Sequence, residues 1–232
     1  MNRVRDAAAP LVEAYRRAGV APGDGSPPSL LAEALEQMFA LFDHLDRLHG
    51  EDAALPDADP SRLGEQALSC LSDLELWADR LGERRTLPRL GELAVEAAEW
   101  TARHGGVVRV LEPVVNAFAA QANALTAPDR LARLCERMGR VIDAADPALR
   151  NDAAATGTFP PWRILLFNHA IVATRTQEAE RMERAFNLLG VFLPQDCPAF
   201  FEEALQQSHK AVYSDAVREV VRQHHQRWTR RH

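Results

Sequence analysis

The chain is nearly without lysine, and it carries no excess of positive charge. Lys210 is its only lysine, so arginine supplies almost all of the 27 basic residues, and 33 acidic residues outnumber them. The net charge of −6 argues against a dedicated binder of nucleic acid or of an anionic membrane surface, since both need a strong positive field. We therefore expect neither nucleic acid nor a membrane as the partner.

Cysteine is scarce, and long apolar runs are missing. Cys70, Cys135 and Cys197 are far apart, and none belongs to a CxxC pair, so the spacing predicts neither a disulfide framework nor a zinc knuckle. No stretch approaches the ~18 apolar residues of a membrane span. The first residues, "MNRVRDAAAP", lack the apolar run of a signal peptide. We expect a cytoplasmic protein that needs no metal and no cofactor.

The familiar catalytic and nucleotide-binding motifs are also missing. The sequence contains no GxSxG, no HExxH, no P-loop and no GxGxxG. No segment shows sustained alternation of β-branched and polar residues, so no sheet is expected. What is present is a helical period in every apolar segment. The sequence predicts an all-α fold of about ten antiparallel-packed helices, as a helical-hairpin array or an α-α superhelix.

Proline, glycine and N-capping residues mark the expected ends of the helices. Ser29 is a candidate N-cap for a helix over 30–49 that Gly50 ends, and Asp59 followed by Pro60 suits the start of the next helix. In the first of these, one face is expected to point inward: Leu31, Leu35, Met38, Phe42, Leu45 and Leu48. The long loop 146–161 predicts a hinge between an N-terminal array, 1–145, and C-terminal hairpins, 162–232, packed together as one domain.

The stretch "RHGGVVRVLEPVVNAFAAQAN", residues 103–123, raises the first question of function. We expect a helix from the glycines to about 125. Its polar residues form one stripe on a helical wheel: Arg109, Glu112, Asn116 and Asn123. Pro113 requires that this helix kink or begin nearby. A solvated face explains the stripe most simply, and a binding face for another chain or a ligand is the alternative.

The segment "PWRILLFNHAIVAT", residues 161–174, raises a second question of function. It is apolar on all sides except at Arg163, Asn168 and His169, and such a helix is buried. Asn168 and His169 therefore need hydrogen-bond partners. A structural pair is our expectation, and the alternative is a histidine that acts as a base or orients a ligand in a pocket.

Residues 178–211 resemble a tetratricopeptide-type helical repeat unit. The spacing of small and large apolar residues carries the likeness: Ala185, Leu188, Cys197, Phe201 and Ala204. The sequence departs from that pattern at three places, where Arg181, Arg184 and His209 replace the usual Trp, Leu and Pro. The resemblance covers only about 34 residues, and it implies a protein-binding superhelix without any catalytic residue.

These observations favour a helical scaffold that binds another protein or a peptide in a groove. The alternative is an all-α enzyme or small-ligand binder whose pocket is formed by five residues: His104, Glu112, Asn116, Asn168 and His169. A third reading is an RNA-associated protein that uses the arginines of the last helix: Arg218, Arg222, Arg227, Arg230 and Arg231. That basic face could also dock on the acidic loop 51–59 of another copy, giving a homodimer.

Overall fold

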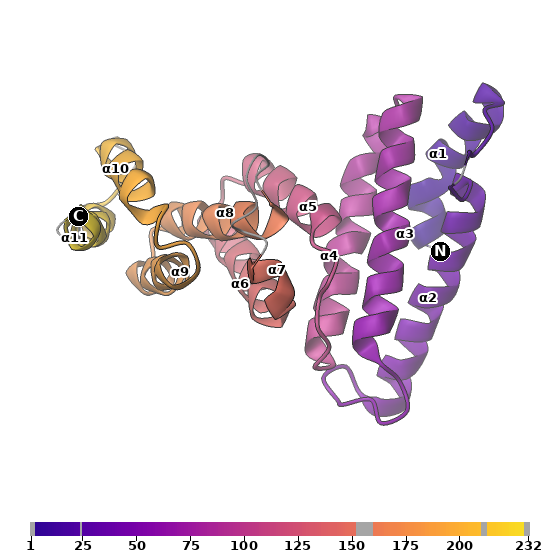
Figure 1. The fold of residues 1–232 in the computed structure, drawn as a ribbon, viewed down its shortest axis with the longest axis horizontal. Helices are drawn as coiled ribbons and strands as arrows, with labels where there is room; N and C mark the ends of the chain where they lie inside the picture. The colour runs from indigo at the N-terminus through magenta and orange to yellow at the C-terminus, as the bar shows by residue number, and fades with distance from the viewer. Residues whose placement is uncertain (1–2, 24, 152–159, 210–212, 230–232) are drawn as a thin grey trace. The chain divides into compact units, whose positions relative to one another are not determined.

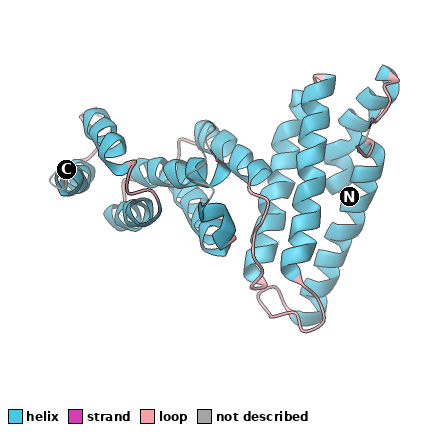
Figure 2. Cartoon of the chain, in the orientation of Figure 1, coloured by secondary structure: helices cyan, strands magenta, loops and turns pink. Residues whose placement is uncertain are grey.

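The chain folds into helices joined by short loops (Figures 1 and 2). A computed structural model describes residues 3–23, 25–151, 160–209 and 213–229, which contain eleven α-helices, one 3₁₀ turn and no strand. The all-α prediction is confirmed. None of the helices in these ranges combines the length and the apolar character needed to cross a bilayer.

The helices are numbered in chain order. Those of the first half are α1 (Arg3–Ala18), α2 (Pro28–His49), α3 (Pro60–Leu81), the 3₁₀ turn η1 (Arg84–Thr86), α4 (Leu87–Arg103) and α5 (Glu112–Ala124). Those of the second half are α6 (Pro128–Ala144), α7 (Pro147–Asn151), α8 (Pro161–Thr176), α9 (Ala179–Phe192), α10 (Cys197–Ser208) and α11 (Asp215–Thr229).

The chain divides into two compact units whose boundaries lie inside helices. Unit 1 consists of residues 1–120 and 143–149, and unit 2 of residues 121–142 and 150–232. The division therefore cuts α5 after residue 120, α6 after residue 142 and α7 after residue 149. The segment 146–161, which the sequence suggested as one long loop, contains the short helix α7 and the start of α8, while residues 152–159 lie outside the described ranges.

Unit 1 is built around four long helices, α1 to α4, that pack side by side (Figure 1). Most of the α2 face that was expected to point inward does enter the core, where Leu31, Leu35, Phe42 and Leu45 are buried. Met38 is only half-buried, and Phe39, which was not expected there, is buried instead. Leu48 is an exception to the prediction, because 64% of it is exposed. It lies in the last turn of α2, on the side away from the core.

The sequence marks the start and end of α3 by capping. The carboxylate of Asp59 accepts the backbone N–H groups of Ser61 and Arg62, and Pro60 stands in the first turn. Gly82 ends the helix in the left-handed conformation. For α2 the predicted cap is wrong: the helix begins at Pro28, so Ser29 lies within it, and Pro27 takes the capping position without a side-chain bond.

Small residues bring the helices of unit 1 into close contact. Gly64 of α3 faces the side chain of Thr101 on α4 so closely that a methyl group at Gly64 would overlap the hydroxyl. Gly91 of α4 faces Ala117 of α5, where an added Cβ would lie 2.8 Å from that of Ala117. The backbones approach closely at both points because one partner has no side chain.

The segment between α4 and α5 is not helical, contrary to expectation. The N–H of Val108 donates to the carbonyl of Ala144 at 2.8 Å, and the N–H of Asp146 donates to the carbonyl of Val108 at 2.9 Å. These bonds form an isolated bridge between the two segments. Helix α5 therefore begins at Glu112, and Pro113 occupies its first turn, where its missing N–H costs nothing.

Unit 2 contains two helical pairs, α8 with α9 and α10 with α11, and α9 also contacts α11. Phe186 of α9 lies at the centre of this packing. Its ring meets those of Phe200 and Phe201 on α10 edge-on, with centroids 6.1 and 5.0 Å away, and that of His224 on α11 at 5.1 Å. The aromatic cluster holds α9, α10 and α11 together.

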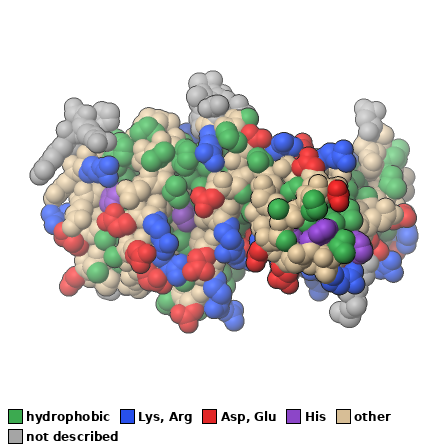
Figure 3. Space-filling view, turned by 90° about the horizontal axis from the view of Figure 1, so that it is seen from below, with side chains coloured by type: hydrophobic (Ala, Val, Ile, Leu, Met, Phe, Trp, Pro, Cys, Tyr) green, Lys and Arg blue, Asp and Glu red, His purple; other side chains and the backbone are tan. Residues whose placement is uncertain are grey.

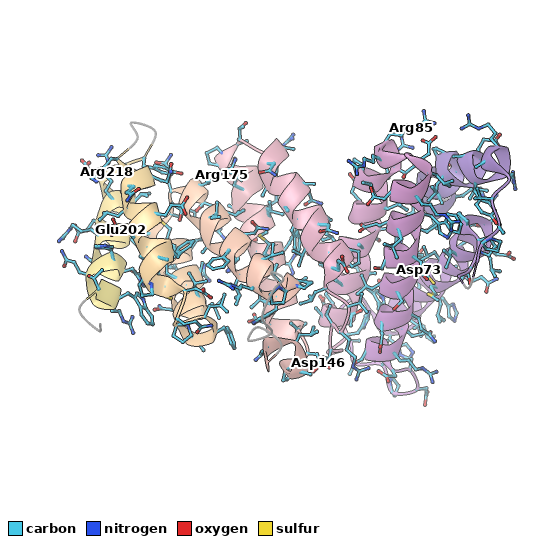
Figure 4. The ribbon with its side chains drawn as sticks, turned by 45° about the horizontal axis from the view of Figure 1, so that its top comes forward. Asp73, Arg85, Asp146, Arg175, Glu202 and Arg218 are labelled. Carbon is cyan, nitrogen blue, oxygen red and sulfur yellow. The ribbon has the colours of Figure 1, made fainter. Side chains whose placement is uncertain are left out.

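An arginine of α8 caps the end of α5 within unit 2. The guanidinium of Arg175 donates to the carbonyls of Ala122 and Leu125, both at 2.5 Å (Arg175 is labelled in Figure 4). The last carbonyls of a helix have no partner within the helix, so this side chain satisfies groups that would otherwise need water.

Candidate functional site

A groove runs between α8 and α10 in unit 2. Its volume is about 660 Å³, and its walls come from one stripe on each helix together with residues just outside α10. The α8 wall consists of Arg163, Phe167, Ile171 and Thr174. The α10 side consists of Asp196, Ala199, Phe200, Glu203, Ala204, Gln207, Ser208 and Tyr213. The spacing of the α8 residues places them along one face of that helix.

Two phenylalanines contribute an aromatic contact across the groove. The rings of Phe167 and Phe200 stack with centroids 5.7 Å apart and an interplanar angle of 23°. Phe186 supports Phe200 from outside the groove lining. Ile171 lies one turn beyond Phe167 and remains 47% exposed, which is high for isoleucine. The middle of the groove is therefore apolar and accessible from solvent.

An ion pair closes one end of the groove. Arg163 Nη2 lies 2.5 Å from Asp196 Oδ1, and the guanidinium also lies over the Phe167 ring, 5.6 Å from its centroid. Both side chains are largely withdrawn from solvent. Because Arg163 is held by a carboxylate and a ring at once, this end of the groove has a fixed shape.

The other end is polar and carries an acidic residue. Thr174, Gln207, Ser208 and Tyr213 line it, and Glu203 lies on the exposed face of α10. Within the described ranges, Glu203 forms no ion pair. The hydroxyl of Ser208 donates to the carbonyl of Leu205, and neither histidine nor cysteine lines the groove. The lining thus contains no nucleophile paired with a base.

His104, one of the residues singled out from the sequence, belongs to a buried network in unit 1. Its Nδ1 lies 2.6 Å from the carbonyl of Ala53, and its Nε2 lies 2.7 Å from Asp46 Oδ1. The indole of Trp100 donates to the same carboxylate oxygen at 2.8 Å. His104 thus ties α4 to α2 and to the loop after α2, and both of its ring nitrogens are in use.

Arg109 also has a structural environment in unit 1. It lies before α5, not on it, and its guanidinium donates to Glu65 at 3.1 Å and to Asp146 at 3.3 Å. These bonds link α3 with the loop before α7. Glu112, in the first turn of α5, is exposed and acidic, as suits the positive end of the helix dipole.

Asn116 lies beside a carboxylate that the sequence did not single out. Its amide donates to Glu75 Oε2 of α3 at 3.3 Å. Burial raises the pKa of Glu75 to about 7, and the charges of Glu112 and Asp79 add to this, against the lowering effect of the Asn116 bond. Glu75 is thus a partly buried carboxyl group that changes its charge near neutral pH.

Replacing Glu75 with glutamine is expected to stabilise the protein at pH 8 by about 1 kcal/mol, reduced from the full effect of the shift because the side chain is partly solvated. The raised pKa means that the folded state binds this proton more tightly than the unfolded chain. The free-energy cost of burying the Glu75 carboxylate is therefore full above pH 7. It disappears as the pH falls from 7 toward 4.5, the ordinary pKa of a glutamate side chain. Urea unfolding at pH 8 and at pH 4.5 measures this difference.

The matched control for Glu75→Gln is Glu92→Gln, at an exposed position on α4. It should change the free energy of unfolding by the same small amount at both pH values. An equal gain at both pH values for the Glu75 variant would show that its carboxyl does not titrate in this range.

The remaining predicted site residues lie in unit 2, and they do not line the groove. Asn123 is exposed near the end of α5, and Asn168 is half-buried on α8. His169 is buried, as the sequence predicted. Burial lowers its pKa to about 4, against the raising effect of a hydrogen bond to the Cys135 backbone. His169 is therefore neutral at physiological pH, and its second nitrogen, Nδ1, has no partner in the described structure.

The cysteines and the acidic clusters offer little chemistry. Burial raises the pKa of Cys135 to about 11 and that of Cys197 to about 12, so neither thiol is readily ionised. In the portion of the chain that the structure covers, no group of three or more His, Cys, Asp or Glu residues is placed to hold a metal ion.

Two of the three arginines in the described part of α11 are held in ion pairs along the helix. Arg218 and Arg222 pair with acidic residues one turn earlier, Asp215 and Glu219 (Arg218 is labelled in Figure 4). Figure 3 likewise shows basic and acidic side chains interspersed over the face that it draws. Arg230 and Arg231 lie outside the described residues.

Sequence reasoning found α8 but missed which of its faces is accessible. It singled out Asn168 and His169, whereas the groove is lined by the stripe that begins at Arg163. Arg163, Phe167, Ile171 and Thr174 follow a helical spacing that places them on one face, but the spacing does not distinguish that face from the others. Which face of an all-apolar helix stays open depends on α10, and the sequence of α8 carries no information about that.

Comparisons with known proteins find no relative of this chain. No protein-family model, no curated protein and no solved structure matches the chain.

Proposed function

We propose that the protein is an interaction module that binds an amphipathic helix of a partner protein in the groove between α8 and α10. The observation that carries this proposal is the accessible apolar stripe on facing helices, with Phe167 stacked against Phe200 and Ile171 open to solvent. Helices laid into apolar grooves are a recurring mode of peptide recognition.

The length of the groove suits a short helix. The α8 wall extends from Arg163 to Thr174, which at 1.5 Å per residue is a distance of roughly 16 Å. About three turns of a partner helix fit alongside it. Such a helix presents two or three apolar side chains at positions i, i+3 or i+4, and i+7.

The exposure of the lining distinguishes this function from small-molecule binding. Pockets for small ligands typically cover 70–90% of the ligand surface. Here Ile171, Ala199, Glu203 and Gln207 all remain exposed on the walls, so the groove covers one side of its occupant. A helix that keeps its polar face in water fits this arrangement.

Charge gives the partner helix a direction. The pair of Arg163 and Asp196 neutralises one end of the groove, and Glu203 leaves a negative charge toward the other. A lysine or arginine on the partner, placed beside Glu203, would complement that charge. The preferred ligand is thus an apolar helix with a basic residue on the edge of its apolar face.

The resemblance of residues 178–211 to a tetratricopeptide-type unit is in keeping with this proposal. Of the residues that carry it, Ala185, Cys197 and Phe201 are buried, and Ala204 lines the groove. A repeat of this kind would imply protein binding by helical hairpins. The proposal itself rests on the groove and does not require the relationship.

Selection from a display library of helix-forming 12-residue peptides tests the function. We expect enriched peptides to share apolar residues at i, i+3 or i+4, and i+7 together with a basic residue. Binding should weaken at least tenfold in Ile171→Asp, because a carboxylate at the centre of the apolar wall must be desolvated by the bound peptide. Fluorescence anisotropy of a labelled peptide measures the affinity.

The matched control is Val191→Asp. Val191 is 70% exposed on α9 of the same unit and does not line the groove, so this variant should bind as the unchanged protein does. Glu203→Lys should favour peptides with an acidic residue in place of the basic one. Equal loss in the two aspartate variants, or no enriched peptide at all, would contradict the proposed function.

A further inference from the structure

The outward face of α2 in unit 1 carries three leucines that remain exposed. Leu30, Leu41 and Leu48 are 54%, 38% and 64% exposed. They lie on the side of the helix opposite to the buried Leu35, Phe39 and Phe42. Together with the residues between them they form one stripe, which we call the α2 seam: Leu30, Ala34, Gln37, Leu41, His44 and Leu48.

The α2 seam has the spacing of a coiled coil. Successive members lie alternately four and three positions apart over 19 residues, which is the a/d spacing of a heptad repeat. Ala34, Leu41 and Leu48 take the a positions, and Leu30, Gln37 and His44 take the d positions. Because α2 extends over 22 residues, the seam covers most of its length.

The residues beside the seam are self-complementary in charge. The adjacent g positions are Glu33, Ala40 and Arg47, all on the exposed side of α2. In an antiparallel pair of helices the g positions of one helix face those of the other. Glu33 then meets Arg47 of the second copy, Arg47 meets Glu33 of the second copy, and the small Ala40 lies near the two-fold axis.

We infer that the protein forms an antiparallel homodimer through the α2 seam. In this register Leu48 packs against Leu30 of the second copy at both ends of the interface. Leu41 packs beside Gln37 of the second copy, and Ala34 faces His44 of the second copy. The contact is isologous, so one set of residues serves both subunits, as in most dimers with two-fold symmetry.

A parallel pair would gain nothing from the same charges. There each g residue faces the next e position of the other helix, and the e positions here are Leu31, Met38 and Leu45 of the core side. Glu33 would then meet Met38, with no opposite charge. The pairing of Glu33 with Arg47 therefore favours an antiparallel second copy over a parallel one.

Analytical ultracentrifugation of the full chain over about 1 to 500 μM tests the dimer. A single pair of helices is a small interface, so we expect a dissociation constant on the order of 1–100 μM. Leu41→Glu combined with Leu48→Glu should raise it at least tenfold. Leu76→Glu is the matched control, because Leu76 is 68% exposed on α3 of the same unit but lies outside the seam.

Charge exchange tests the direction of the pairing. Glu33→Arg alone or Arg47→Glu alone should weaken the dimer, because like charges then meet twice. The variant with both changes should recover the original dissociation constant. A protein that stays monomeric at 500 μM, a dimer that Leu76→Glu weakens as much as the seam variant does, or a dimer indifferent to all the charge changes would overturn the inference.

Discussion

Replacing Gly64 with alanine is expected to lower the free energy of unfolding by about 3 kcal/mol, in the upper range for overpacking of a tight core. The added methyl group would overlap the hydroxyl of Thr101 and come within 3.0 Å of its Cβ. Thr101 has no easy movement to offer, because it is fully buried and its hydroxyl donates to the carbonyl of Ala97 at 2.8 Å. Helices α3 and α4 would have to separate.

Chemical denaturation of two further variants makes this prediction specific. Combining Gly64→Ala with Thr101→Ala should restore part of the lost stability, since the second change removes the atoms that clash. Gly139→Ala on α6 is the control. An added Cβ there lies 3.8 Å from the nearest atom, on His169, so alanine should raise stability by up to about 1 kcal/mol through its helix propensity. A Gly64 variant as stable as the Gly139 variant would show that α3 and α4 are not in close contact.

Replacing His104 with alanine is expected to cost about 3 kcal/mol, since it removes a buried ring and leaves a carboxylate short of a donor. The ring packs against Trp100, with centroids 4.7 Å apart, and Trp100 stacks on Phe42 at 3.9 Å. Asp46 would keep its bond from the Trp100 indole but lose that from His104. The carbonyl of Ala53 would lose its partner as well.

The control for His104→Ala is His225→Ala on α11. His225 lies 2.8 Å from Glu202 of α10, nearly the same distance as between His104 and Asp46, but its partner is exposed (Glu202 is labelled in Figure 4). Pairs in water contribute about 0–1 kcal/mol. Thermal melting should therefore separate the two variants by several degrees. Equal melting temperatures would mean that the His104 network contributes no more than a surface pair.

The helices could be predicted because their signals are local. Asp59 and Pro60 mark the start of α3 by capping and by a fixed φ angle, and no other part of the chain is needed for that. The boundary of α5 could not be predicted in the same way. Residues 107–111 are mostly apolar, like the helix that follows them, so the sequence predicted that they would be helical. Their backbone instead bonds to a distant segment, because Val108 pairs with Ala144 and Asp146, 36 and 38 residues further along the chain.

The surroundings of the candidate site residues were harder to predict than the helices, because they depend on residues far away in the sequence. His169 was expected to be buried, and it is, because an all-apolar helix has no polar face to turn to water. The sequence could not show that His104 would meet Asp46, since 58 residues separate them. Leu48 illustrates the same limit. It follows the buried Leu45 by three residues, which predicted burial, but it lies on the side of α2 away from the core and is exposed.

The three crossings of the chain between the units set an order for folding during synthesis. Unit 1 needs residues 143–149, because Val108 bonds to Ala144 and Asp146. When residue 120 leaves the ribosome, the α1–α4 helices can pack, but the segment before α5 still lacks its partner. Residues 121–142 must be made first, and they belong to unit 2. Domains usually fold in sequence as they emerge, whereas here unit 1 is completed only after unit 2 has begun.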